Sequence, residues 1–260
     1  MTTLEEQAHR NLCDFTVWCH GLEPEGRSID RLGVVGLAAG PDSPSGRTLV
    51  RRTAELAPEA WADAAEAFVF ADGKTACCFS RIGADDDIAA VLLARGFTEY
   101  ATTPEMVCED PLAARPDPTG FRVRLARTPA DVLAYAAVAG EAFAHLGMPA
   151  ESVQHALERH ERLLVPEVAV AVAESGDGKI VAGAMSVLLG PDANGYVGWV
   201  ACADSARGHG LGDAVTRRVT NDAFDRGAPL VTLEASRFGE NTYARMGYRE
   251  LYRYRLLIKV

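Results

Sequence analysis

The sequence predicts an α/β fold built on a mixed sheet, and the second half of the chain indicates this most clearly. Two strand-like runs, Val168–Glu174 and Lys179–Leu189, flank a Ser-Gly-Asp-Gly turn and should form a hairpin. A third strand is expected at Tyr196–Cys202. Beyond it, apolar residues recur every four positions from Leu211 to Ala223, which is typical of one helix face. Strands and helices in this order indicate a mixed α/β sheet.

Two helices and a buried strand complete this half. One helix should run from Pro129 to about His145, because Thr128 is a suitable N-cap and proline fits the first helical turn. Another helix is predicted over Glu151–Leu164. The apolar run Leu230–Ala235 predicts a buried strand.

Both halves of the chain end in the same way. A short helix stopped by a glycine, Gly96 or Gly247, is followed each time by an aromatic residue and then a strand. Glycine suits this place because the left-handed conformation just past a helix costs it little. The repeat predicts two copies of one fold. The alternative is two unrelated α/β domains that finish alike.

Length and composition bound the domain organisation. The chain has 260 residues, more than the ~100 to 150 of a usual domain. Three prolines between Asp110 and Gly120 indicate a linker, so we place the domains at residues 1–112 and 119–260. The strands that close them are expected at Glu105–Glu109 and Leu251–Val260.

Charge and hydropathy exclude several classes of protein. The chain carries 26 basic and 36 acidic residues, a net charge of −10, which argues against nucleic-acid binding. Acidic residues at Glu5, Glu6 and Asp14 do not fit a signal peptide, and the apolar stretches are shorter than the ~20 residues that span a bilayer. Six cysteines without a C-x-x-C pair predict free thiols. We therefore expect a cytoplasmic protein without membrane partners.

A glycine-rich loop at Arg207–Gly212, between the third strand and the following helix, is the most informative segment. Glycines let backbone amides approach an anion, and the positive end of the helix adds attraction, so phosphate is the natural ligand. A dinucleotide fingerprint would need glycine at Asp213, and a P-loop would need lysine there. The spacing present is Arg-x-x-Gly-x-Gly. A tight turn without a ligand is the alternative.

This spacing resembles the coenzyme-A loop of the GNAT superfamily of N-acetyltransferases, Q/R-x-x-G-x-G/A. A second family-like segment, residues 233–248, follows the next strand as the family arrangement requires. The resemblance covers about Phe121–Val260 and implies a GNAT-like acyl-CoA N-acyltransferase fold. Because the first half has no such loop, it is similar to a degenerate GNAT copy that has lost the cofactor site, as in tandem members of the superfamily.

The resemblance also implies site residues. In the family, the strand before the loop binds the pantetheine arm and polarises the thioester carbonyl, and the loop amides hold the pyrophosphate. Tyr243 matches the general-acid tyrosine of the family, although an aromatic on a short helix can also serve only for packing. The cofactor-binding residues so implied are Val200, Ala201, Cys202, Arg207, Gly208, His209, Gly210, Leu211, Gly212 and Asn241.

The general base is left open among three residues. Glu141, His145 and Glu234 can each accept or relay a proton from an amine. No metal is required for acetyl transfer. His155 and His160 are five apart on an expected helix, so they face different directions and make a poor metal pair.

The predicted function is transfer of the acetyl group of acetyl-CoA to a primary amine by direct attack. The partner is a small-molecule or peptide amine, and the protein is expected to be a monomer or homodimer. Two alternatives from other classes remain. One is a non-catalytic acyl-CoA-binding sensor or interaction module, and the other is a nucleotide-binding regulator.

Overall fold

The computed structural model describes residues 2–23, 25–40, 46–69 and 75–259. Two compact units divide the chain. The first consists of Met1–Met106, Glu234–Arg237 and Glu250–Val260, and the second of Val107–Leu233 and Phe238–Arg249. Val260, the end of the last predicted strand, lies outside the described residues.

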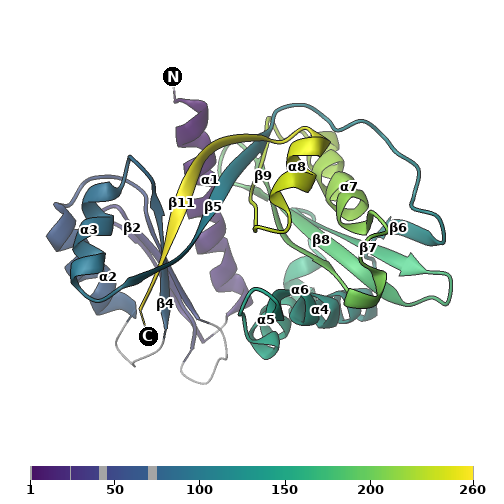
Figure 1. The fold of residues 1–260 in the computed structure, drawn as a ribbon, viewed down its shortest axis with the longest axis horizontal. Helices are drawn as coiled ribbons and strands as arrows, with labels where there is room; N and C mark the ends of the chain where they lie inside the picture. The colour runs from purple at the N-terminus through teal and green to yellow at the C-terminus, as the bar shows by residue number, and fades with distance from the viewer. Residues whose placement is uncertain (1, 24, 41–45, 70–74, 260) are drawn as a thin grey trace. The chain divides into compact units, whose positions relative to one another are not determined.

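The first unit contains an antiparallel meander of three strands, β1 to β3, followed by β4, which pairs parallel with β3. Helix α1 lies on one side of this sheet, and α2 and α3 lie on the other (Figure 1). Its elements are α1 (Leu4–Trp18), a short 3-10 helix (Cys19–Leu22), β1 (Arg27–Arg31), β2 (Val34–Ala38), β3 (Arg47–Arg51), α2 (Pro58–Val69), β4 (Ala76–Arg81), α3 (Asp86–Ala94) and β5 (Thr98–Cys108).

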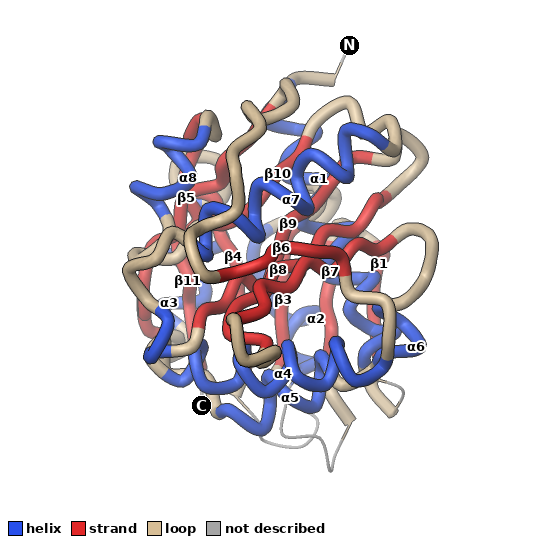
Figure 2. Tube along the Cα trace, turned by 90° about the vertical axis from the view of Figure 1, so that its right-hand side faces the viewer, coloured by secondary structure: helices blue, strands red, loops and turns tan. Residues whose placement is uncertain are grey.

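The second unit repeats this plan around strands in the order β10-β9-β8-β7-β6. Helices α7 and α8 lie on one face of its sheet, and α4 and α5 lie on the opposite face (Figures 1 and 2). Its elements are β6 (Phe121–Leu125), α4 (Pro129–Ala144), α5 (Ala150–Leu157), α6 (His160–Leu163), β7 (Val168–Ser175), β8 (Ile180–Leu189), β9 (Asn194–Cys202), a 3-10 helix (Asp204–Ala206), α7 (Leu211–Asp225), β10 (Val231–Glu234) and α8 (Glu240–Met246). The last strand, β11 (Arg249–Lys259), follows α8 and belongs from Glu250 onward to the first unit.

Local sequence signals account for the two long helices of the second unit. Thr128 caps α4 by accepting a hydrogen bond from the Asp131 amide, and Asp131 bonds back to the cap, which forms a capping box. The predicted apolar face of α7 is buried, since Leu211 is 1% exposed and Val215 and Val219 are fully buried. The predicted mixed α/β sheet, its hairpin and these two helices are confirmed.

The single helix predicted over Glu151–Leu164 is wrong, because the structure divides this segment into α5 and α6. The backbone leaves the helical region at Arg159, where ψ is 64°. Leu157 and Leu163 are both buried although they are six positions apart. A continuous helix would turn such a pair to different faces. The break therefore directs Leu163 into the core.

The predicted boundary between residues 112 and 119 also differs from the structural units. It placed the last strand with the second half, whereas Glu250–Val260 belongs to the first unit. The physical reason is strand pairing, because β11 pairs antiparallel with β4 from Tyr254↔Arg81 to Lys259↔Ala76. The proline-rich linker lies wholly within the second unit.

The predicted glycine stops are present in both units. Gly96 has φ of 89° after α3, and Gly247 has φ of 121° after α8. The aromatic residues that follow, Phe97 and Tyr248, are 2% and 3% exposed. Along the chain, the two halves also share the order of three strands, helix, strand, helix, strand. This common order supports two tandem copies of one fold.

No helix of the described chain combines the length and apolar character that crossing a membrane requires.

Candidate functional site

An irregularity in β9 marks the centre of the second unit. The register between β8 and β9 shifts between Gly183 and Met185, and Trp199 adopts a left-handed φ of 55°. The Tyr135 hydroxyl donates to the Trp199 carbonyl at 2.7 Å. A side chain at Gly183 would meet the Tyr135 ring, since its Cβ would lie 2.3 Å from the ring. Tyr135 on α4 therefore packs on Gly183 and holds the bulge in place.

Strand β9 also separates from its neighbour soon after the two meet. It pairs parallel with β10 only at Gly195↔Val231 and Tyr196↔Thr232, and it continues to Cys202. Residues 197–202 thus extend beyond the pairing with β10. Backbone groups along such an edge are available to a ligand that lies extended beside the strand. Beyond Tyr196, strand β9 is therefore splayed from β10.

The glycine loop follows β9 and begins α7. Gly208 and Gly210 adopt left-handed φ of 82° and 76°, and Gly210 is the N-cap of α7 without a side-chain cap. A Cβ at Gly208, Gly210 or Gly212 would have no atom within 4 Å. Among the described residues, the first-turn amides of Leu211 and Gly212 have no acceptor. Open space and free amides at a helix N-terminus suit an anion.

The loop faces an open cavity of about 1090 Å³ within the second unit. This volume is slightly above the ~300 to 1,000 Å³ usual for ligand sites. Of the predicted cofactor-binding residues, Val200 and Ala201 lie in β9 just before the cavity, and Asn241 is exposed on α8 outside it. The predicted residues that line it are Cys202, Arg207, Gly208, His209, Gly210, Leu211 and Gly212.

The cavity lining is positively charged although the chain as a whole is acidic. The formal net charge of the chain is −10, yet five arginines and two aspartates line this one cavity. Such a local excess of cations favours an anionic ligand. The charged lining residues are Arg115, Arg207, Arg217, Arg218, Arg245, Asp117 and Asp213.

Tyr243 is buried on α8, where its ring lies 6.0 Å from that of Tyr248 between centroids. A Cβ at Gly239 would lie 2.5 Å from its ring, so this glycine makes room for the tyrosine. Burial raises the pKa of Tyr243, and the Thr216 side chain opposes this shift. The phenol of Tyr243 is thus buried within the second unit, and its pKa lies above the usual value.

A polar cluster surrounds Asp204 at the end of β9. The Asp204 amide donates to the Glu141 carboxylate at 3.1 Å. Its own carboxylate contacts His145 Nε2 at 2.9 Å and Arg207 Nη2 at 2.9 Å. Burial raises the pKa of the neighbouring Cys202 thiol. Two of the predicted bases, Glu141 and His145, therefore lie together beside the cavity.

The third predicted base lies elsewhere. Glu234 ends β10, and Glu234–Arg237 belongs to the first unit. Burial raises the pKa of Tyr252 and Tyr254, and the carboxylates of Glu105 and then Glu234 add to this shift. Glu234 is thus assigned to the first unit, whereas Glu141, Tyr243 and the loop belong to the second.

The linker is the part of the site that sequence reasoning missed. Asn221 on α7 donates to the Leu112 carbonyl at 2.9 Å and accepts from the Leu112 amide at 2.8 Å. Arg217 Nη1 donates to the Ala113 carbonyl at 3.0 Å. Residues 114–118 then line the cavity. The available signal was the helical spacing of Leu211, Ala214, Arg218 and Asn221, which places the polar side chains of Arg218 and Asn221 in line with the loop.

Comparison with known proteins agrees with this geometry. Residues 139–248 match the model of the Acetyltransferase (GNAT) family. No match was found among curated protein sequences.

Several solved structures share the fold. A GCN5-related N-acetyltransferase from Kribbella flavida has a TM-score of 0.70 and 21% identity, covering 97% of this chain and 95% of that one. A GCN5-related N-acetyltransferase from Sphaerobacter thermophilus has a TM-score of 0.61 and 20% identity, and the match covers 89% of this chain and 82% of that one. A tandem GNAT protein from the clavulanic acid biosynthesis pathway has a TM-score of 0.58 and 16% identity, and the match covers 87% of this chain and 78% of that one. Residues 139–248 are therefore a domain of the acetyltransferase (GNAT) family, carried by a chain whose fold is that of GCN5-related N-acetyltransferases.

Proposed function

We propose that this protein transfers the acetyl group of acetyl-CoA to a primary amine of a small molecule or peptide by direct attack. The observation that carries the proposal is the α7 loop, whose free amides and left-handed glycines face a cavity rich in arginine. The match of residues 139–248 to an acetyltransferase family model supports the same activity.

The residues of the second unit fit coenzyme A. The amides of Gly208 to Gly212, with Arg207 and His209 beside them, would hold the pyrophosphate at the positive end of α7. The unpaired edge of β9 at Val200, Ala201 and Cys202 would bond to the extended arm, as strands do with added peptides. Bound acetyl-CoA supplies a thioester carbonyl that a neutral amine attacks.

Two side chains transfer protons in the reaction, Glu141 as the general base and Tyr243 as the general acid. Glu141 takes a proton from the attacking amine, and its place beside Cys202 and Asp204 supports this role over that of Glu234, which belongs to the first unit. As the new N–C bond forms and the C–S bond breaks, Tyr243 gives its phenolic proton to the departing thiolate. A phenol whose pKa is raised by burial stays protonated at neutral pH and can act as the acid.

Direct attack on the thioester is supported by the state of the one thiol that lines the cavity. Burial raises the pKa of Cys202, so the thiol stays protonated, and the thiolate is the nucleophilic form. The neighbouring imidazole of His145 is held by Asp204. An acetylated Cys202 intermediate is therefore disfavoured. The net charge of −10 also favours a cationic amine as acceptor.

Acetyl transfer is tested by incubating the protein with carbon-13-labelled acetyl-CoA and a mixture of polyamines, amino acids, aminoglycosides and peptides. Mass spectrometry should detect at least one amine that gains a labelled acetyl group. Gly210→Glu should abolish the product, because it places a carboxylate in the anion site. Gly178→Glu is the matched control, since Gly178 has a similar φ of 83° and open surroundings in the turn between β7 and β8. Coenzyme binding without any labelled product would contradict catalysis.

A further inference from the structure

Four arginines outside the glycine loop line the same cavity, and three of them are alike: Arg115 in the linker, Arg218 on α7 and Arg245 on α8. We call them the outer arginines. Arg115 Nη1 lies 3.7 Å from Asp213 Oδ2, a long ion pair, and the Arg115 side chain is 61% exposed. Arg245 makes one long contact, 3.4 Å from Nη2 to Thr242 Oγ1. These guanidinium groups keep donors for a ligand.

Arg217, which also lines the cavity, has a different role. Its Nε and Nη2 donate to Asp213 at 3.2 Å and 3.0 Å, its Nη1 donates to the Ala113 carbonyl, and its side chain is only 7% exposed. Its fork is therefore used within the protein. It fixes the linker to α7, whereas no ion pair or hydrogen bond of the Arg218 side chain occurs among the residues that the structure describes.

The position of Arg218 separates it from the loop. It lies seven residues after Leu211 along α7, which corresponds to about 10 Å at the rise of an α-helix. The cavity thus offers anion-binding groups at the N-terminus of α7 and again about two turns along it. A ligand that carries phosphate at two places matches such a surface better than one with a single pyrophosphate.

Coenzyme A has this character, because a phosphate monoester on the 3′ carbon of its ribose is separate from the pyrophosphate. We propose that the outer arginines bind this 3′-phosphate and thereby select coenzyme A over analogues that lack it. The inference rests on the proposed function. A monoester carries close to two negative charges, and guanidinium groups bind phosphate with bidentate, charge-assisted hydrogen bonds.

The linker is then a wall of the coenzyme site as well as a connection. The paired hydrogen bonds between Asn221 and Leu112 and the bond from Arg217 to Ala113 hold the backbone immediately before Arg115. A fixed backbone reduces the conformational freedom that Arg115 loses when it binds phosphate. The linker therefore contributes to recognition of the ligand's nucleotide end.

The test compares coenzyme A with 3′-dephospho-coenzyme A by isothermal titration calorimetry, so no acceptor is needed. The wild-type protein should bind coenzyme A about 10- to 100-fold more tightly than the dephospho form, as expected for charged hydrogen bonds. The combined variant Arg115→Gln, Arg218→Gln, Arg245→Gln should bring this ratio close to one while leaving the dephospho Kd within about threefold.

The matched control is Arg122→Gln, Arg127→Gln, Arg162→Gln, which removes the same charge from exposed positions of the second unit outside the cavity. It should keep the wild-type ratio. An unchanged ratio in the outer-arginine variant, or an equal loss of affinity for both ligands, would overturn the inference while the proposed function stands. Absence of binding of either ligand to the wild-type protein would overturn the proposed function itself.

Discussion

The third strand of the meander differs between the two units. In the first unit β2 and β3 pair without a register shift, and β3 pairs parallel with β4 from Arg47↔Ala76 to Val50↔Phe79. In the second unit the matching strand β9 is bulged and pairs with β10 at two positions only. One arrangement keeps the strand paired and the other opens an edge. The same fold can thus be closed or open at this strand.

The segment after that strand differs in the same sense. Residues 52–57 contain no glycine, and Arg52 is held by Asp14 at 2.8 Å and Asp30 at 2.9 Å. In the second unit Gly210 opens the helix with bare amides. The arginine after the strand thus has a different role in each unit. Arg52 is held within the first unit, whereas Arg207 lines the cavity of the second.

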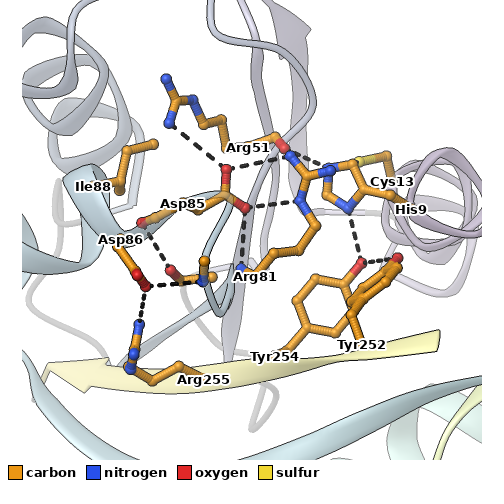
Figure 3. A network of polar contacts seen from close by, with 12 residues as sticks. His9, Cys13, Arg51, Arg81, Asp85, Asp86, Ile88, Tyr252, Tyr254 and Arg255 are labelled. Atoms are coloured by element: carbon orange, nitrogen blue, oxygen red, sulfur yellow. Dashed lines mark hydrogen bonds and ion pairs between the residues drawn. The ribbon is translucent and has the colours of Figure 1, made fainter. Parts of the chain in front are cut away.

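A helix side chain bonds to the third strand in each unit, but the chemistry differs. In the first unit, His9 Nε2 on α1 donates to the Arg51 carbonyl at 2.6 Å. In the second unit, the hydroxyl of Tyr135 donates to the Trp199 carbonyl in the same way. The Tyr254 hydroxyl then donates to His9 Nδ1 at 2.8 Å, within a network that also contains Arg81 and Asp85 (Figure 3). We propose that the first unit is structural and that coenzyme binding is confined to the second.

The largest effect that separates the units is expected from Tyr243→Phe. This change keeps the ring against Gly239 and removes only the proton donor. The kcat should fall by about 10² to 10⁴ while acetyl-CoA affinity stays nearly constant. Steady-state kinetics with an acceptor found by mass spectrometry measures both. Tyr248→Phe is the control, because it loses a buried hydrogen bond to Thr220 and should lower stability but not kcat. An unchanged kcat for Tyr243→Phe would make that residue a packing residue.

A smaller effect is expected from pH on the first unit. Burial, with the charge of Arg81 second, lowers the pKa of His9 from its usual 6.5 to about 4. At a pH between these two values, His9 is protonated in the unfolded chain and neutral in the folded chain. Stability is therefore lost as pH falls from 6.5 to 4, by about 3 kcal/mol for this group.

His9→Gln keeps a hydrogen-bond donor and cannot titrate. Urea unfolding at pH 7 and pH 4.5 should show that wild-type stability declines more steeply than that of the variant. Because Tyr135 occupies the matching place in the second unit and does not titrate in this range, the difference should be confined to the first unit. If the free energy of unfolding fell equally with pH in the wild type and in His9→Gln, His9 would not be held neutral in the folded chain.

The smallest effect concerns Cys202, the predicted thiol that lines the cavity. Acetyl-CoA should protect it from iodoacetamide, and at ten times the Kd its alkylation should slow about tenfold, since few sites remain empty. Peptide mass spectrometry measures the rate. Cys77 in the first unit is the internal control and should react at the same rate with and without ligand. Equal protection of both thiols would indicate a general conformational change.

The sequence predicts the local elements well because their signals are local. Apolar periodicity fixes α7, and glycines at 96 and 247 fix two helix stops, each within a few residues. The exchange of β11 into the first unit depends on pairing with β4, about 175 positions away, and no periodicity reports such a partner. For this reason the predicted domain boundary misses the last strand.

The site is predictable in part for the same reason. The loop is one contiguous motif, so seven predicted cofactor residues line one cavity. The bulge at Trp199 and its bond from Tyr135 join residues 64 positions apart, and only the folded chain reveals them. The role of the linker is also non-local, since it depends on the contacts of Asn221 and Arg217. The roles of Tyr243, Glu141 and Glu234 stay predictions.

The central claim is that one unit of this tandem chain binds acetyl-CoA, through the α7 loop. Titration calorimetry of acetyl-CoA into the wild-type protein, Gly210→Glu and Gly178→Glu tests it most directly. The account predicts one molecule bound per chain, no detectable binding to Gly210→Glu, and wild-type affinity for Gly178→Glu. Two molecules per chain, or an unchanged Kd for Gly210→Glu, would contradict it.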